Sequence, residues 1–144
     1  MKDTFVREWM TPDPVTVSSL TTLPEAHKLM AQRKIRRLLV VDDGRLVGII
    51  TRGDVRGAEP SGATTLSIYE LNYLLAKLTI GAIMTRHPVT VGPDTPIREA
   101  ARLMLEHKIA GLPVVADGRV VGIITESDIF RLVAKTWGAE EDRN

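Results

Sequence analysis

The sequence predicts a mixed α/β (α+β) fold, built from two copies of one β-α-β-β-α unit packed about a pseudo-twofold axis, with a linker helix. The first observation is an internal repeat: residues 10–54 align with residues 84–128 without a gap, and more than half of the aligned positions are identical. The second is that each copy shows apolar residues first at helical and then at strand spacing. An ungapped duplication of this kind indicates two similar supersecondary units.

Composition is that of an ordinary globular chain. The 144 residues are 44% hydrophobic and 26% charged, with a net charge of +1. This length can bury a sizeable core, and the balanced charge gives no general attraction to nucleic acid or to anionic membranes. The absence of cysteine excludes disulfides and cysteine-ligated zinc. No signal peptide and no apolar run near the roughly 20 residues of a membrane helix are recognisable, so we expect a soluble, cytoplasmic protein.

The first half of each copy predicts a short strand followed by a helix. The segment PVTV occurs at 14–17 and again at 88–91, and its β-branched residues favour an extended backbone. Apolar residues then recur at helical spacing, as in Ile97, Ala100 and Met104. Thr22 and Glu25 have the spacing of a capping box, and in the second copy we expect a capping residue just ahead of Pro96.

The second half of each copy predicts a hairpin and another helix. The apolar stretches 38–41 and 112–115 are each followed by Asp-Gly, at 43–44 and 117–118, which is a strong hairpin signal. The return strands run from 46 to 51 and from 120 to 125. The second helices are expected to begin near Asp54 and Asp128.

These patterns divide the chain into four parts. Residues 1–57 form the first repeat, 58–78 a helical linker, 79–138 the second repeat and 139–144 an acidic tail that we expect to fray. Gly57, Pro60, Ser61 and Gly62 predict a loop. The helix predicted over 67–78 has Ser67 and Glu70 at capping-box spacing.

The chain resembles the cystathionine-β-synthase (CBS) domain in the order of its motifs, which is MT-x-x-PVTV, a helix, K-I-x-x-L-x-VV, a DG turn and GIIT-x-x-D. The domain is present twice, as in a CBS pair or Bateman module of the small stand-alone type. The resemblance covers about residues 6–57 and 79–133. It implies a module that binds an adenosine-containing ligand and reports binding to a partner. It thus implies a regulatory sensor of AMP, ADP or ATP, with S-adenosylmethionine also possible, and not an enzyme.

The resemblance also implies site residues. The Asp of the GIIT-x-x-D motif would hold the ribose hydroxyls, the Thr would contact phosphate, and the Ile two residues before the Thr would line the pocket. The main cleft would use Asp128, Thr125, Ile123, Arg36, Arg37, Ile35, Met10 and Val15. The second cleft would use Asp54, Thr51, Ile49, Met84, Val89, Ile109 and Ala110.

The chemistry of these residue types agrees with that assignment. An ionised Asp only accepts hydrogen bonds, so it can take both hydroxyls of a ribose. A helix beginning near the Asp presents free N–H groups to an anion, and branched apolar residues can enclose a purine. The Arg36-Arg37 pair suits phosphate through its planar guanidinium groups, whereas the second copy has Ala110-Gly111 there. We therefore expect the Asp128 cleft to be the better phosphate site.

Other interpretations remain open from the residues alone. Asp54 and Asp128 could cap helices, and one Asp can do both. The basic cluster at 33–37 could bind nucleic acid, although the low aromatic content of 4% argues against recognition by stacking. The module could also be a structural dimerisation unit with empty clefts.

We expect no metal site, because the three histidines share no ligand spacing, and no required cofactor. Apolar helix faces favour a homodimer, and the regulated effector protein is unknown.

Overall fold

The computed structural model describes residues 3–59 and 67–142 and contains two compact units. The central unit comprises residues 15–88, and the terminal unit comprises residues 1–14 together with 89–144. The chain therefore enters the terminal unit, passes through the central unit and returns. Among the described residues, no helix is both long and apolar enough to cross a lipid bilayer.

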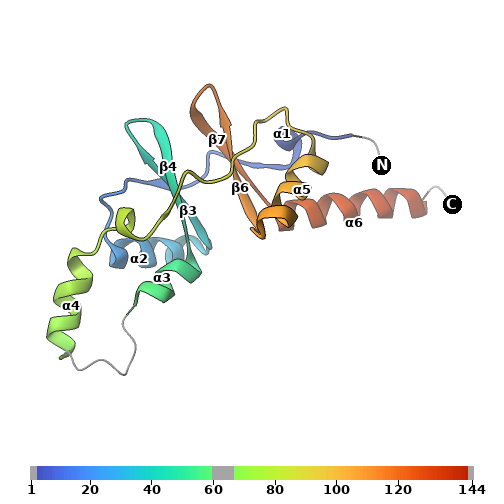
Figure 1. Ribbon diagram of the computed structural model, residues 1–144. Helices are drawn as coiled ribbons and strands as arrows, with labels where there is room; N and C mark the ends of the chain where they lie inside the picture. Colours follow the sequence, from blue (N-terminus) through green and yellow to red (C-terminus); the bar gives the residue numbers. More distant parts are fainter. Residues whose placement is uncertain (1–2, 60–66, 143–144) are drawn as a thin grey trace. The chain divides into compact units, whose positions relative to one another are not determined.

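The central unit contains a four-stranded sheet in the order β2-β3-β4-β5. Its strands are β2 (Thr16–Val17), β3 (Arg37–Asp42), β4 (Arg45–Thr51) and β5 (Thr85–Arg86), and only the β2–β3 pair is parallel. Its helices are α2 (Leu23–Arg33), α3 (Arg52–Ala58), α4 (Ile68–Lys77) and the 3-10 turn η1 (Ile80–Ala82). Figure 1 shows α2 and α3 side by side next to the β3–β4 hairpin.

The terminal unit repeats this plan with one strand fewer. It contains α1 (Val6–Trp9), β1 (Thr11–Pro12), α5 (Ile97–His107), β6 (Gly111–Ala116), β7 (Arg119–Thr125) and α6 (Glu126–Asp142), with the sheet order β1-β7-β6. The segment 88–91, expected to be a strand like 14–17, forms only a single bridge between Val91 and Val114.

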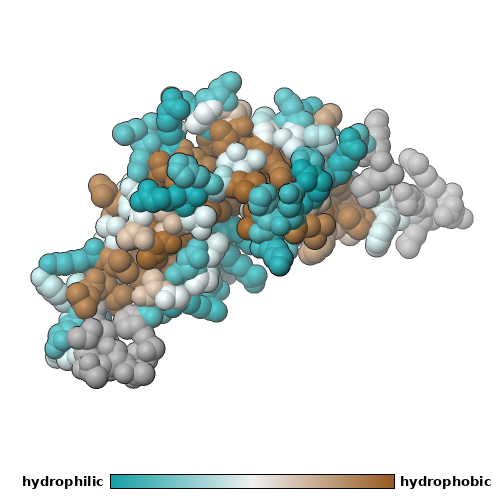
Figure 2. Space-filling model, in the orientation of Figure 1, coloured by the Kyte–Doolittle hydropathy of each residue, from teal (hydrophilic) through white to brown (hydrophobic). Residues whose placement is uncertain are grey.

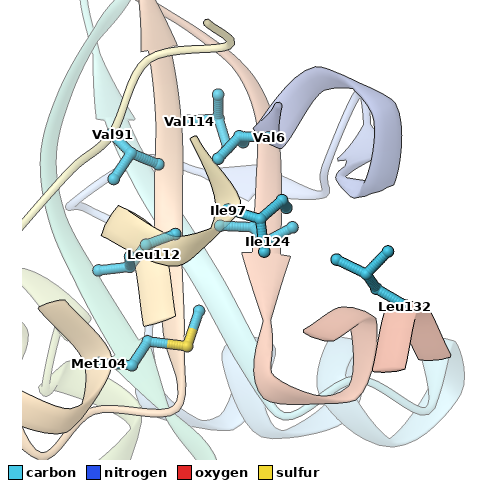
Figure 3. Close-up of a cluster of buried hydrophobic side chains, with 9 residues drawn as sticks. Val6, Val91, Ile97, Met104, Leu112, Val114, Ile124 and Leu132 are labelled. Atoms are coloured by element: carbon cyan, nitrogen blue, oxygen red, sulfur yellow. The ribbon is translucent and has the colours of Figure 1, made fainter. Parts of the chain in front are cut away.

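Each sheet carries one apolar core. In the terminal unit, Leu112, Val114 and Ile124 of the hairpin are fully buried against Ile97 and Met104 of α5 (Figure 3). In the central unit, Leu38, Val40 and Ile50 take the same places against Leu23 and Met30. The repeat in the sequence is thus a repeat of the core, as predicted.

The two hairpin turns confirm the Asp-Gly prediction. Asp43 and Gly44 have φ of 51° and 77°, and Asp117 and Gly118 have the same values. Positive φ at both central residues is the requirement of a type I′ turn, which only glycine, asparagine and aspartate meet at low cost. Figure 2 shows hydrophilic residues at both hairpin tips.

Helix starts agree with the predictions in the central unit and differ in the terminal unit. Thr22 and Glu25 form the predicted capping box, with each backbone N–H bonded to the other side chain, and Ser67 caps α4. In the terminal unit the prediction of a capping residue ahead of Pro96 is wrong: Pro96 is itself the N-cap of α5. The Thr95 hydroxyl instead accepts a hydrogen bond from the Gly92 N–H at 3.0 Å, and so it stabilises the preceding turn.

The second helices begin at Arg52 and Glu126, two residues before Asp54 and Asp128, as expected. The helix α6 continues to Asp142, so residues 139–142 of the expected acidic tail belong to a helix. Of the predicted loop, Gly57 lies in α3, and Pro60, Ser61 and Gly62 lie outside the described residues.

Candidate functional site

The Thr-x-x-Asp motif lies where a β-strand turns into a helix. At the start of α3, the Thr51 N–H donates to Asp54 Oδ2 at 2.8 Å and the Asp54 N–H donates to Thr51 Oγ1 at 3.2 Å. This is a capping box with Asp in place of Glu. The capping interpretation of Asp54 is therefore correct. Its other carboxylate oxygen, Oδ1, has no hydrogen bond or ion pair within the described part of the chain.

The second copy of the motif differs in burial and in its partners. Asp128 is 1% exposed, and its Oδ2 accepts bonds from the Thr125 N–H at 2.8 Å and the Thr125 hydroxyl at 3.3 Å. Its Oδ1 forms an ion pair with the guanidinium of Arg131, one helical turn along α6. Arg131 is itself 63% exposed in its side chain, so it covers the carboxylate from the solvent side.

Arg131 is not among the site residues predicted from the sequence. Its spacing from Asp128 is i, i+3 on a helix, which brings two side chains together, so the pair was recognisable in principle. The corresponding residue of the first copy is Gly57, which cannot supply a partner for Asp54. The two aspartates therefore share a motif but not an environment.

The methionines that open each repeat lie beside the return strand of the other repeat. Met10 precedes β1, whose Thr11 pairs with Ile123 of β7, and Met84 precedes β5, whose Thr85 pairs with Ile49 of β4. The predicted groups Met10–Ile123–Asp128 and Met84–Ile49–Asp54 are each contained in one unit.

Glycines at 48 and 122 allow the methionine segments to lie close against the return strands. A Cβ on Gly122 would lie 2.5 Å from the Met10 sulfur and 3.0 Å from the Thr11 carbonyl oxygen, and a Cβ on Gly48 would lie 2.5 Å from the Met84 sulfur. Any larger residue at these positions would push the methionine segments away from the strands. The glycine of the GIIT-x-x-D motif thus has a packing role that the sequence alone did not reveal.

The remaining predicted site residues are distributed between the units. Val15, Ile35, Arg36 and Arg37 belong to the central unit, and Val89, Ile109 and Ala110 to the terminal unit. Val15 and Ile35 pack against the central core, and Val89 and Ile109 against the terminal core. Arg36 is exposed at the surface. Their assignment to the clefts of Asp128 and Asp54 stays a prediction.

Within residues 3–59 and 67–142, the structure contains no group of three or more His, Cys, Asp and Glu side chains suited to a metal ion.

The family model of the CBS domain matches the chain twice, at residues 6–61 and 80–135. Among curated relatives, the chain is 37% identical over 131 residues to the L-aspartate semialdehyde sulfurtransferase of Methanocaldococcus jannaschii, with 90% of this chain covered. It spans only 23% of the length of that enzyme.

Two solved structures are similar over nearly the whole chain. One is the CBS domain pair of protein MJ0100 in complex with 5′-methylthioadenosine and S-adenosyl-L-methionine, with a TM-score of 0.77 and 35% identity, covering 94% of this chain and 99% of that chain. The other is CBSX2 in complex with AMP, with a TM-score of 0.76 and 32% identity, covering 92% of this chain and 97% of that chain.

Proposed function

Because the chain belongs to the CBS domain family and carries the domain twice, we propose that it is a regulatory module that binds an adenosine-containing ligand. The observation that carries the proposal is the duplicated Thr-x-x-Asp motif, which sets a carboxylate at the first turn of a helix in each repeat. The similar CBS pairs solved with AMP and with 5′-methylthioadenosine and S-adenosylmethionine support this ligand class.

In this proposal Asp128 accepts the ribose hydroxyls and Thr125 contacts phosphate. Ile123, Met10, Val15 and Ile35 supply the apolar surface for the purine, since branched and thioether side chains fit a flat ring closely. Arg36 and Arg37 supply the charge for phosphate. The second cleft uses Asp54 and Thr51 with Ile49, Met84, Val89, Ile109 and Ala110, and it offers phosphate less positive charge because Ala110 stands in the place of Arg36.

Ribose binding at Asp128 requires a rearrangement of Arg131. The Oδ2 atom of Asp128 already accepts two bonds from Thr125, and Oδ1 is paired with the Arg131 guanidinium. Arg131 is exposed and can be rehydrated, but Asp128 is buried, so its carboxylate needs a new partner when the guanidinium leaves, and the ribose hydroxyls supply it. When a ribose takes its place, the freed guanidinium can turn to a phosphate of the same ligand.

The output of such a module is a change in its interaction with another protein. Larger enzymes such as the sulfurtransferase of M. jannaschii contain a matching segment within a longer chain. We propose that this module acts on a separate effector protein, and that ligand binding shifts the module between two states that bind the ligand unequally.

We also propose that the chain forms a homodimer through its helices. Leu105 of α5 and Phe130 of α6 are 82% and 65% exposed, although large apolar side chains favour burial. They lie on neighbouring helices around one hollow of the terminal unit, which a second copy can cover.

A thermal-shift series tests the ligand class. We expect AMP, ADP, ATP or S-adenosylmethionine to raise the melting temperature of the purified chain in a saturable manner, since a ligand present at 100 times its Kd adds about 2.7 kcal/mol of stability. Guanosine nucleotides are the matched control and should shift it less. A set of shifts that is the same for adenosine and guanosine ligands, or absent for all, contradicts the proposal.

A further inference from the structure

A basic cavity opens between α2 and α3 in the central unit, with a volume of about 470 Å³. Its floor is apolar, formed by Met30, Ile35 and Val55. Five basic side chains surround this floor, and we call the site the basic groove: His27, Lys34, Arg36, Arg52 and Arg56. Glu59 is the one carboxylate among the described residues that line it.

Four of the five basic side chains have no acidic partner among the residues that the structure describes. Glu59 contacts His27, with 3.0 Å between Oε1 and Nδ1. Among the residues that the structure describes, no carboxylate lies within ion-pair distance of Lys34, Arg36, Arg52 or Arg56. Arginines elsewhere do have such partners, as Arg7 has Asp94, and Arg102 has Glu99 and Glu106. Like charges that line one cavity repel one another, and a bound anion would relieve this repulsion in the basic groove.

The fold itself does not require this charge. The equivalent hollow of the terminal unit, between α5 and α6, has a volume of about 480 Å³. By the repeat alignment, Arg36, Arg52 and Arg56 correspond there to Ala110, Glu126 and Phe130, and His27 corresponds to Ala101. Only Lys34 has a basic counterpart, Lys108. The same backbone thus carries a basic hollow in one repeat and an apolar one in the other.

The basic groove lies apart from the ribose-binding motif of its own repeat. Arg52 and Arg56 are one helical turn apart and share a face of α3, while Asp54 falls on the opposite side of that helix. Neither Thr51 nor Asp54 lines the basic groove. An anion bound in it would therefore not occupy the carboxylate of Asp54.

We propose that the basic groove binds a compact anion with at least two negative charges, of the phosphate ester or polyphosphate class. Guanidinium groups offer paired N–H donors that match phosphate oxygens, and three arginines line this groove. The apolar floor excludes water from one side, which strengthens the attraction. Of the residues assigned to the main adenosine-ligand cleft, the basic groove contains Arg36 and Ile35.

Calorimetric titration with inorganic triphosphate tests the proposal. We expect saturable binding with one triphosphate per chain, weakened about tenfold in Arg52→Gln and in Arg56→Gln, since each loses one charged hydrogen-bonding group. Glu59→Gln should have the opposite effect and tighten binding several-fold, because it removes the only negative charge among the lining residues of the basic groove. Opposite effects of substitutions around one groove cannot come from unfolding.

Two controls separate this site from other sources of binding. Arg45→Gln removes an exposed arginine of the same unit outside the basic groove, and it should leave the affinity for triphosphate unchanged. Saturating adenosine, which carries no phosphate, should also leave it unchanged. Absence of binding, an equal loss in Arg45→Gln, or competition by adenosine would each overturn the proposal. The first two outcomes leave the adenosine-ligand proposal untouched.

Discussion

Replacing Asp128 with asparagine is expected to weaken the binding of the adenosine ligand about 100-fold. The asparagine side chain would keep one acceptor oxygen but lose the negative charge, and hydrogen bonds to a charged group contribute about 1.5–3 kcal/mol each. Two ribose hydroxyls depend on this carboxylate in the proposed site, and tenfold in affinity corresponds to about 1.4 kcal/mol. Titration calorimetry of the variant and the unaltered chain measures the change directly.

Two further variants make the result specific. Asp94→Asn removes an exposed carboxylate of the same unit that pairs with Arg7, and it should leave affinity unchanged. Asp54→Asn should reduce only the weaker of two binding events. If Asp54→Asn abolished binding and Asp128→Asn left the affinity unchanged, the order of the two clefts would be reversed. Unchanged affinity in both variants would refute the assignment of the motif.

Leu112→Ala is expected to lower the free energy of unfolding by about 2–5 kcal/mol, which is the usual cost of removing a buried leucine side chain beyond its β-carbon. Leu112 is fully buried in the terminal core, on the strand that also carries Val114 (Figure 3). Leu38 occupies the matching place in the central core and is also fully buried, so Leu38→Ala should cost a similar amount. Urea denaturation followed by circular dichroism measures both.

Leu20→Ala is the matched control, because Leu20 is 79% exposed. It should change the free energy of unfolding by less than about 0.5 kcal/mol, as surface substitutions do. A loss in Leu112→Ala no larger than that of Leu20→Ala would show that the terminal core does not stabilise the fold.

The parts of the fold that the sequence predicted are those with local causes. The Asp-Gly turns follow from the backbone freedom of those two residues, and the capping box of Thr22 and Glu25 follows from a spacing of three. The helix at 67–78 was likewise predicted from the Ser67 cap and the apolar spacing, and the structure has α4 at Ile68–Lys77.

The strand partners of the two methionine segments could not be predicted in this way. MTPDPVTV and MTRHPVTV are nearly the same, and so are the return strands VGIIT at 47–51 and 121–125. Local residue preferences therefore do not decide which segment pairs with which strand. In the structure β1 pairs with β7 and β5 pairs with β4. This pairing depends on the course of the whole chain and not on local sequence.

Differences between the repeats were predicted less well than their similarities. The predicted site residues included identical positions of the two copies, such as Thr51 and Thr125, and the Arg36-Arg37 pair. Arg131 and the charges at 52 and 56 stand at positions where the copies differ, and they decide the surroundings of Asp128 and the basic groove. In a duplicated chain, unlike residues at equivalent positions are where the two sites acquire different chemistry.

Calorimetric titration of the unaltered chain with AMP, ADP, ATP and S-adenosylmethionine tests most directly whether the chain binds an adenosine-containing ligand. We expect saturable heat with at least one of these four, and a stoichiometry of one or two ligands per chain. A chain that is folded by circular dichroism and yet gives no saturable heat with AMP, ADP, ATP or S-adenosylmethionine would contradict it.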